Sequence, residues 1–276
     1  MTGQMTATSR KGLHQWFQSP TGRVLLELEE DIIASRLPSL FGYHLLQVGQ
    51  LSAKDMLSGS LILQRHIIDI DDSQIDCAHP RIRSRADCLP VASDSIDVVM
   101  LPHVLEFETH PHEALREVQR VLVAEGNLLI TGFNPWSMMG LWRTVLKGRN
   151  TMPWRGQFLG LNRVRDWLAL LGFDVTAVDT FFFRPPLQNS KLMAKLNGME
   201  SFGPRLGGVL AGAYVIAAKK RISTLTPIKP RWSSGRRLAS VGLANTSVRA
   251  GSSGHRRIPP HLTVVHAADL VCRKKV

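Results

Sequence analysis

Three histidines lie close together in the middle of the chain, at His103, His110 and His112. Imidazoles bind metals and transfer protons near neutral pH, so such a group could form a metal site or supply a general base. Spacings of seven and two residues across a loop match no common zinc-binding pattern, and we therefore predict no metal site. We retain His103 alone as a candidate catalytic base on the substrate side of an active site.

The cysteines suggest neither a metal site nor a disulfide framework. Cys77, Cys88 and Cys272 are scattered and form no Cys-x-x-Cys pair,. The first twenty residues lack the apolar segment of a secretory signal, and no run of about 18 uncharged apolar residues occurs,. These features predict a cytoplasmic protein without a transmembrane segment.

Short apolar runs alternate with helical stretches over most of the chain. The predicted strands are Tyr43–Val48, Ile67–Ile70, Ile96–Leu101, Asn127–Thr131, Asp174–Phe182 and Ala211–Ala218. The predicted helices are Thr21–Ser35, Leu51–Leu57, Pro111–Leu122, Ser137–Leu146 and Leu161–Leu171. Such alternation is typical of an α/β fold, here a doubly wound, mostly parallel sheet with helices on both faces.

Charge and composition divide the chain into three parts. Residues 221–276 hold eleven Lys and Arg against one acid, Asp269, and therefore carry most of the net charge of +12. This segment is rich in Pro, Ser and Gly, so we predict a basic, disordered tail. We predict a folded domain at residues 21–220 and a flexible N-terminal segment at 1–20, where Trp16 and Phe17 are the only bulky pair.

The middle of the chain contains five short motifs in a fixed order. Asp87-Cys88-Leu89-Pro90 is followed by Ser95-Ile96-Asp97-Val98-Val99, His103-Val104-Leu105, Leu115 to Leu122, and Glu125-Gly126-Asn127-Leu128. In order and spacing they resemble the central region of class I S-adenosylmethionine-dependent methyltransferases of the type 11 group. The resemblance covers about residues 43–220 and implies a Rossmann-like sheet whose last strand is antiparallel, with S-adenosyl-L-methionine as cofactor.

The resemblance also implies where the adenosyl group would bind. A doubly wound sheet binds nucleotides beyond the carboxyl ends of its first strands. Gly49 would allow the close backbone approach after the first strand, and Asp71, with Asp69 as its nearest substitute, would hold the ribose hydroxyls. Asp87 and the backbone of Cys88-Leu89 would face the adenine. His103 would border the sulfonium and the substrate.

The first family motif, acid-x-Gly-x-Gly-x-Gly, is degenerate in this sequence. Gln47 replaces the acid and can still hydrogen-bond the cofactor, but it lacks the charge that meets the cofactor's ammonium. Leu51 and Ala53 replace two glycines and are expected to bring side chains to the place where the backbone lies against the ligand.

Three functions follow from these features. The first is methyl transfer to an unidentified acceptor. The second is a binding or scaffold role for a methyltransferase fold that has lost catalysis, as the degenerate glycine motif would allow. The third is contact of the basic tail 221–276 with nucleic acid or an anionic surface.

Overall fold

The computed structural model describes residues 2–52, 54–69, 79–146, 153–185 and 210–221. Asp71 and Ala53 lie outside the described residues, as does the predicted tail apart from Arg221. The chain divides into two units at residues 225 and 226, and the description below concerns the first unit. None of the helices in the described ranges combines the length and the apolar character that a bilayer crossing requires.

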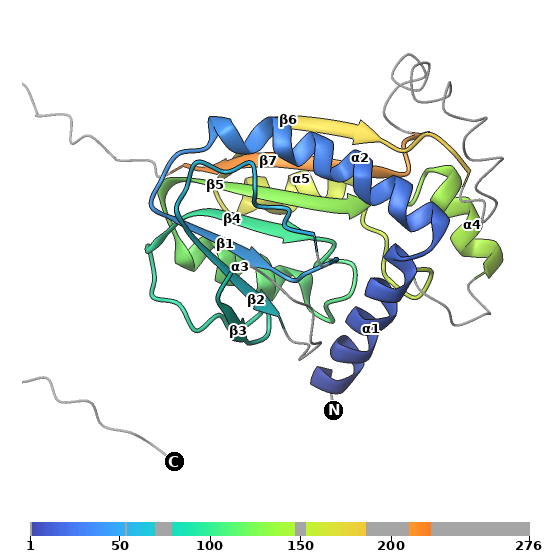
Figure 1. The fold of residues 1–276 in the computed structure, drawn as a ribbon, viewed down its shortest axis with the longest axis horizontal. Helices are drawn as coiled ribbons and strands as arrows, with labels where there is room; N and C mark the ends of the chain where they lie inside the picture. The colour runs from blue at the N-terminus through green and yellow to red at the C-terminus, as the bar shows by residue number, and fades with distance from the viewer. Residues whose placement is uncertain (1, 53, 70–78, 147–152, 186–209, 222–276) are drawn as a thin grey trace, which may run out of the picture. The chain divides into compact units, whose positions relative to one another are not determined.

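One seven-stranded sheet forms the centre of the domain (Figure 1). Its strands follow the order β3-β2-β1-β4-β5-β7-β6. The strands are β1 (His44–Val48), β2 (Gln64–Asp69), β3 (Arg81–Arg83), β4 (Ile96–Pro102), β5 (Leu122–Phe133), β6 (Phe173–Phe181) and β7 (Ala213–Lys220). The five strands from β3 to β5 pair in parallel, and β7 pairs antiparallel with both β5 and β6. The predicted doubly wound sheet with an antiparallel last strand is therefore confirmed.

Helices cover both faces of this sheet. On one face lies α2 (Pro20–Arg36), and on the other lie α3 (Pro111–Val121) and α5 (Leu161–Leu170) (Figure 1). A short 3-10 turn, Leu37–Ser39, follows α2, and α4 (Met138–Leu146) follows β5. Alternate residues of a strand point to opposite faces, so Val98 and Met100 of β4 belong to the core under α2, and Val99 belongs to the core under α3 and α5,.

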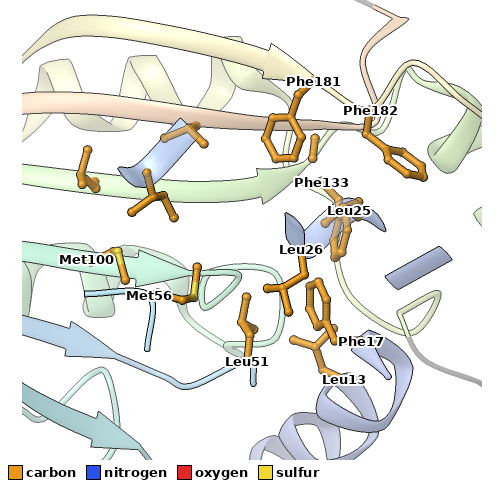
Figure 2. Packing of buried hydrophobic residues seen from close by; sticks show 14 of the residues in the cluster. Leu13, Phe17, Leu25, Leu26, Leu51, Met56, Met100, Phe133, Phe181 and Phe182 are labelled. Atoms are coloured by element: carbon orange, nitrogen blue, oxygen red, sulfur yellow. The ribbon is translucent and has the colours of Figure 1, made fainter. Parts of the chain in front are cut away.

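The first twenty residues do not form the flexible segment that the sequence predicts. Thr2–Phe17 is a helix, α1, and it lies at the end of the sheet toward which the parallel strands point (Figure 1). Leu13, Trp16 and Phe17 are buried, and their spacing of three and four residues puts them on one side of the helix,. Leu13 and Phe17 pack in the same apolar cluster as Leu51 (Figure 2). This apolar stripe is the physical reason that the segment is ordered.

The local structure differs from the prediction at two further places. The described residues of the predicted helix Leu51–Leu57 form turns, because polar side chains bind nearby backbone amides,. Ser52 Oγ accepts from the Lys54 amide at 3.2 Å, and Asp55 Oδ1 accepts from the Leu57 amide at 2.9 Å. Strand β3 was not predicted, since three residues at a sheet edge, Arg81–Arg83, carry almost no apolar pattern.

Candidate cofactor-binding site

A narrow cleft of about 10 Å³, open to solvent, lies where the carboxyl ends of β1 and β2 meet the chain after β4. It is small beside the roughly 300–1,000 Å³ of a typical ligand pocket. Gly49 and Asp69, two of the residues that the sequence assigns to the adenosyl site, both line it. The lining residues are Arg10, Val48, Gly49, Ile68, Asp69, Ser84, Ala86, Val104 and Glu108.

The turn after β1 exposes backbone to this cleft. Gly49 has a φ of +85°, a conformation that L side chains rarely adopt, and a Cβ atom at this position would collide with the guanidinium of Arg10,. The Gly49 amide donates to the Ile68 carbonyl at 2.6 Å. Gln47 is buried, and its Nε2 donates to the Gly49 carbonyl at 2.8 Å. Gln47 therefore holds the turn in place, and its amide does not line the cleft.

An acidic side chain is present at the end of β2. Asp69 is the last residue of that strand, and its Oδ2 accepts from the Gln50 amide at 2.8 Å. Asp71, the first choice for binding the ribose, lies outside the described residues. Asp69, its nearest substitute, is thus the acid that the structure brings to the cleft beside Gly49.

The segment expected to face the adenine is already tied to its neighbours. Asp87 forms an ion pair with Arg85, and the Cys88 amide donates to the Arg85 carbonyl at 3.3 Å. The Leu89 amide donates to Glu117 Oε2 at 3.2 Å. These partners use the amides that the adenine was expected to meet. Asp87, Cys88 and Leu89 do not line the cleft, whereas Ala86, the residue before them, does.

His103 is buried within the domain and has no exposed surface. Its Nδ1 lies 3.0 Å from Glu106 Oε1, and its Nε2 lies 3.2 Å from Glu29 Oε2 of α2. Burial alone would lower the pKa of His103, but the two carboxylates outweigh that effect and raise the pKa to about 9,. Both ring nitrogens of His103 face carboxylates, and no surface of its side chain is open to a substrate. The structure therefore contradicts the expected role of His103 as a base.

Two charged residues of the cleft were missed by the sequence reasoning. Arg10 of α1 is buried, and its Nη1 lies 3.4 Å from the carbonyl oxygens of both Pro102 and His103. Glu108 follows β4, and its pKa is raised chiefly by burial, with Arg10 acting in the opposite direction. The apolar stripe of α1 was the signal that could have revealed an ordered helix around Arg10; no motif marks Glu108.

The described ranges contain no group of three or more His, Cys, Asp or Glu side chains arranged to hold a metal ion. His110 and His112 are exposed at the start of α3, and the ring of His112 lies against Trp167 with the ring centres 3.9 Å apart. The absence of a metal from the protein stays a prediction.

Comparison with known proteins decides the family. A family model described as a methyltransferase domain matches residues 52–130. The uncharacterized protein YafS of Escherichia coli (strain K12) is 33% identical over 230 residues, which are 82% of this chain and 90% of YafS. A methyltransferase structure from Thermotoga maritima, described as S-adenosylmethionine-dependent and as a possible histamine N-methyltransferase, has a TM-score of 0.54 at 15% identity. The match covers 75% of this chain and 93% of that one. This chain belongs to the class I methyltransferase family.

A second curated relative agrees with that assignment over a shorter region. The malonyl-[acyl-carrier protein] O-methyltransferase of Methylovorus sp. (strain MP688) is 27% identical over 115 residues, which are 42% of this chain and 38% of that protein.

The degenerate glycine motif of this methyltransferase has a structural consequence that the sequence did not reveal. Leu51 was expected to bring its side chain against the ligand, but it is buried in the cluster that contains Leu13 and Phe17 of α1 (Figure 2). His14 Nδ1 lies 2.6 Å from the Leu51 carbonyl oxygen. Leu51 thus anchors α1 next to the cleft, and its own side chain does not line the cleft.

Proposed function

We propose that this methyltransferase binds S-adenosylmethionine in the cleft between β1, β2 and β4 and transfers its methyl group to an acceptor. The observation that carries the proposal is the meeting of Gly49 and Asp69 in one cleft at the carboxyl ends of two adjacent parallel strands. A doubly wound sheet binds nucleotides at this edge.

The residues of the cleft fit the adenosyl group. Gly49 has no side chain, so a nucleoside can approach the backbone there once the Arg10 guanidinium, which lies over Gly49, moves aside,. The buried carboxylate of Asp69 can accept hydrogen bonds from two ribose hydroxyls,. When bound, S-adenosylmethionine supplies a methyl group on a positively charged sulfur. The residues of this chain have the task of orienting donor and acceptor and excluding water, for which a strong general base is not required.

A second, larger pocket supports an acceptor with an apolar part. It measures about 410 Å³ and lies beyond the carboxyl end of β5. Its walls include Pro135, Trp136 and Phe158, and Arg163 from the first turn of α5 adds a positive charge. Trp136 is 76% exposed, so its ring is available to a ligand,.

Equilibrium titration with S-adenosylmethionine and S-adenosylhomocysteine tests the proposed function. We expect saturable binding and a rise in the midpoint of thermal unfolding, since a ligand that binds only the folded state stabilises it by about 2.7 kcal/mol at a hundred times its Kd. Asp69→Asn should weaken binding, and Asp94→Asn, a change of the same kind at an exposed loop position, should leave it unchanged. No heat and no thermal shift at millimolar ligand would contradict the proposal.

The scaffold alternative predicts a different outcome in the same titration. A protein that has lost catalysis together with cofactor binding would give no signal, whereas one that has lost catalysis alone would bind the cofactor without turning it over. Single-turnover assays with methyl-labelled cofactor and cell extract as the source of acceptor separate the second case from an active enzyme.

The charge of the tail supports a further contact with polyanions. Eleven Lys and Arg lie in residues 221–276 against a single acid. We infer that this segment contacts nucleic acid or an anionic surface, with an affinity that falls steeply as salt rises. Deletion of residues 222–276 should abolish such binding to a DNA or RNA duplex and leave cofactor binding intact. Binding that is independent of salt, or that survives the deletion, would contradict this contact.

A further inference from the structure

Arg10 is a buried guanidinium with few good partners. Its side chain is 6% exposed, and its two hydrogen bonds, both to neutral carbonyl oxygens, are long at 3.4 Å,. In the part of the chain that the structure describes, no carboxylate lies within ion-pair distance of Arg10. Burial of a charge without a paired group is costly. A guanidinium with five donors that lines an open cleft is therefore suited to an anion that enters the cleft.

The packing of helix α1 against the core fixes the position of Arg10. Leu13 and Phe17 follow it on the same helix and pack in the cluster that contains Leu51 of the turn after β1 (Figure 2). The guanidinium lies over Gly49, close enough that a side chain there would collide with it. Leu51, which replaces a glycine of the family motif, therefore packs against the helix that carries Arg10. This packing places the Arg10 guanidinium over Gly49.

A carboxyl group lines the same cleft. Glu108 forms no hydrogen bond or ion pair within the described ranges. The positive charge of Arg10, which lines the same cleft, lowers the pKa of Glu108 and so favours its charged form. The acid of the usual motif is missing, because Gln47 stands there and its side chain is turned to the Gly49 carbonyl. One cationic and one acidic side chain therefore line a cleft beside the turn where the sequence lacks its acid.

We propose that Arg10 and Glu108 bind the amino-acid end of the cofactor, Arg10 taking its carboxylate and Glu108 its ammonium. This inference rests on the proposed function. A guanidinium binds a carboxylate through two parallel, charge-assisted hydrogen bonds, which are stronger than the two long bonds that Arg10 makes to carbonyls. The Arg10 side chain must leave those carbonyls when the ligand enters, since it occupies space over Gly49 in the narrow cleft. Helix α1 is then a wall of the cofactor site.

Three ligands that share the methylthioadenosine part test the assignment. S-Adenosylmethionine has both charged groups of the amino-acid end, its decarboxylated form keeps the amine alone, and 5′-methylthioadenosine, a neutral thioether, lacks the whole amino-acid chain. In equilibrium titrations we expect Arg10→Ala to weaken S-adenosylmethionine about 10- to 100-fold, as for loss of a charged hydrogen bond, and to change the other two less than about 2-fold. Glu108→Gln should weaken S-adenosylmethionine and its decarboxylated form and spare 5′-methylthioadenosine.

Control variants distinguish the loss of a contact with the ligand from a general effect of removing a charge. Arg23→Ala and Glu113→Gln remove the same charges from exposed positions of α2 and α3 and should leave all three ligands unaffected. Arg10→Lys, which keeps the charge and loses the fork, should retain part of the affinity if Arg10→Ala destabilises α1. Equal loss of all three ligands in Arg10→Ala and Arg10→Lys, or tighter binding of S-adenosylmethionine by Arg10→Ala, would overturn the inference. A wild-type chain that binds none of the three would overturn the proposed function itself.

Discussion

The two faces of the sheet are built in different ways. Under α3 and α5 the core is apolar and includes Leu115, Val118 and Leu168. Under α1 and α2 the apolar cluster surrounds a buried charged group made of Glu29, His103 and Glu106. Glu106 also accepts from the Phe133 amide at 2.8 Å, and so links β5 to the chain after β4.

The two faces therefore have different roles: the apolar face stabilises the fold, and the charged face also positions the helices beside the cleft. The apolar face needs only shape and hydrophobic area, which many sequences can supply. On the charged face, each buried group must keep its partners, since a lone buried charge is costly. The Arg10 side chain bonds the His103 carbonyl, so the charged face borders the cleft directly. We infer that the charged group fixes the helices that complete the cleft.

The largest effect is expected from Glu106→Ala. The substitution leaves a buried His103 with one carboxylate partner and leaves the Phe133 amide without its acceptor. Removing one partner of a buried ion pair costs about 3–5 kcal/mol, and we expect a loss of that size in the free energy of unfolding. Urea unfolding at pH 7 measures it. A loss below about 1 kcal/mol would show that the charged group does not support this face.

A substitution that creates a cavity on the apolar face gives the comparison with Glu106→Ala. Leu115→Ala removes a fully buried side chain from α3 and should cost about 2–5 kcal/mol,. Because no titratable group is involved, this cost should be the same at pH 6.5 and pH 9. The measurement is again urea unfolding, at both pH values. A cost that changes with pH would mean that the two faces are coupled.

The charged face should weaken as the solution becomes alkaline. The pKa of His103 is about 9 in the folded chain and about 6.5 when unfolded, so its stabilising contribution is complete below pH 6.5,. That contribution declines as pH rises through 9 and amounts to about 3 kcal/mol. His103→Gln should remove this dependence while the rest of the titration curve stays. Identical curves for wild type and variant between pH 6.5 and 9.5 would contradict the assignment.

The smallest change in the free energy of unfolding is expected from a substitution that releases the segment around Leu89 and Val91. Arg120 donates to the carbonyls of Leu89 and Val91 at 3.1 and 2.9 Å and so ties this segment to α3. The side chain is partly exposed, and Arg120→Ala should cost about 1 kcal/mol in the free energy of unfolding,. Chemical denaturation checks this value, with Arg116→Ala on the exposed side of α3 as the matched control. A cost equal to that of the control would show that the tie contributes nothing.

Much of the apolar framework was predictable from the sequence. Strand β4 contains the apolar run from Val98 to Leu101, and a run of this kind predicts a buried strand,. Helix α3 has Pro111 in its first turn and a regular apolar side, which predict its start and its buried face,. The antiparallel strand came from the resemblance to a family. Gly49 was identified because a motif requires it, and Asp69 only as a substitute for Asp71.

The charged face could not be predicted in the same way. Arg10 and the carbonyl of His103 are 93 residues apart, and Glu29 and His103 are 74 apart, so no local pattern connects them. His103 was assigned to the substrate side because a motif places it after a strand, whereas the tertiary structure buries it under α2. No local sequence pattern marks Glu29 as buried, and only the packing of α2 shows that it is.

A crystal structure with S-adenosylhomocysteine would show where the cofactor binds. We expect the adenosyl group against the Gly49 backbone, the ribose hydroxyls on the Asp69 carboxylate and the carboxylate of the ligand on Arg10. A ligand bound elsewhere, or crystals soaked at millimolar ligand in which Arg10 keeps its bonds to Pro102 and His103 and the cleft shows no density, would contradict this expectation.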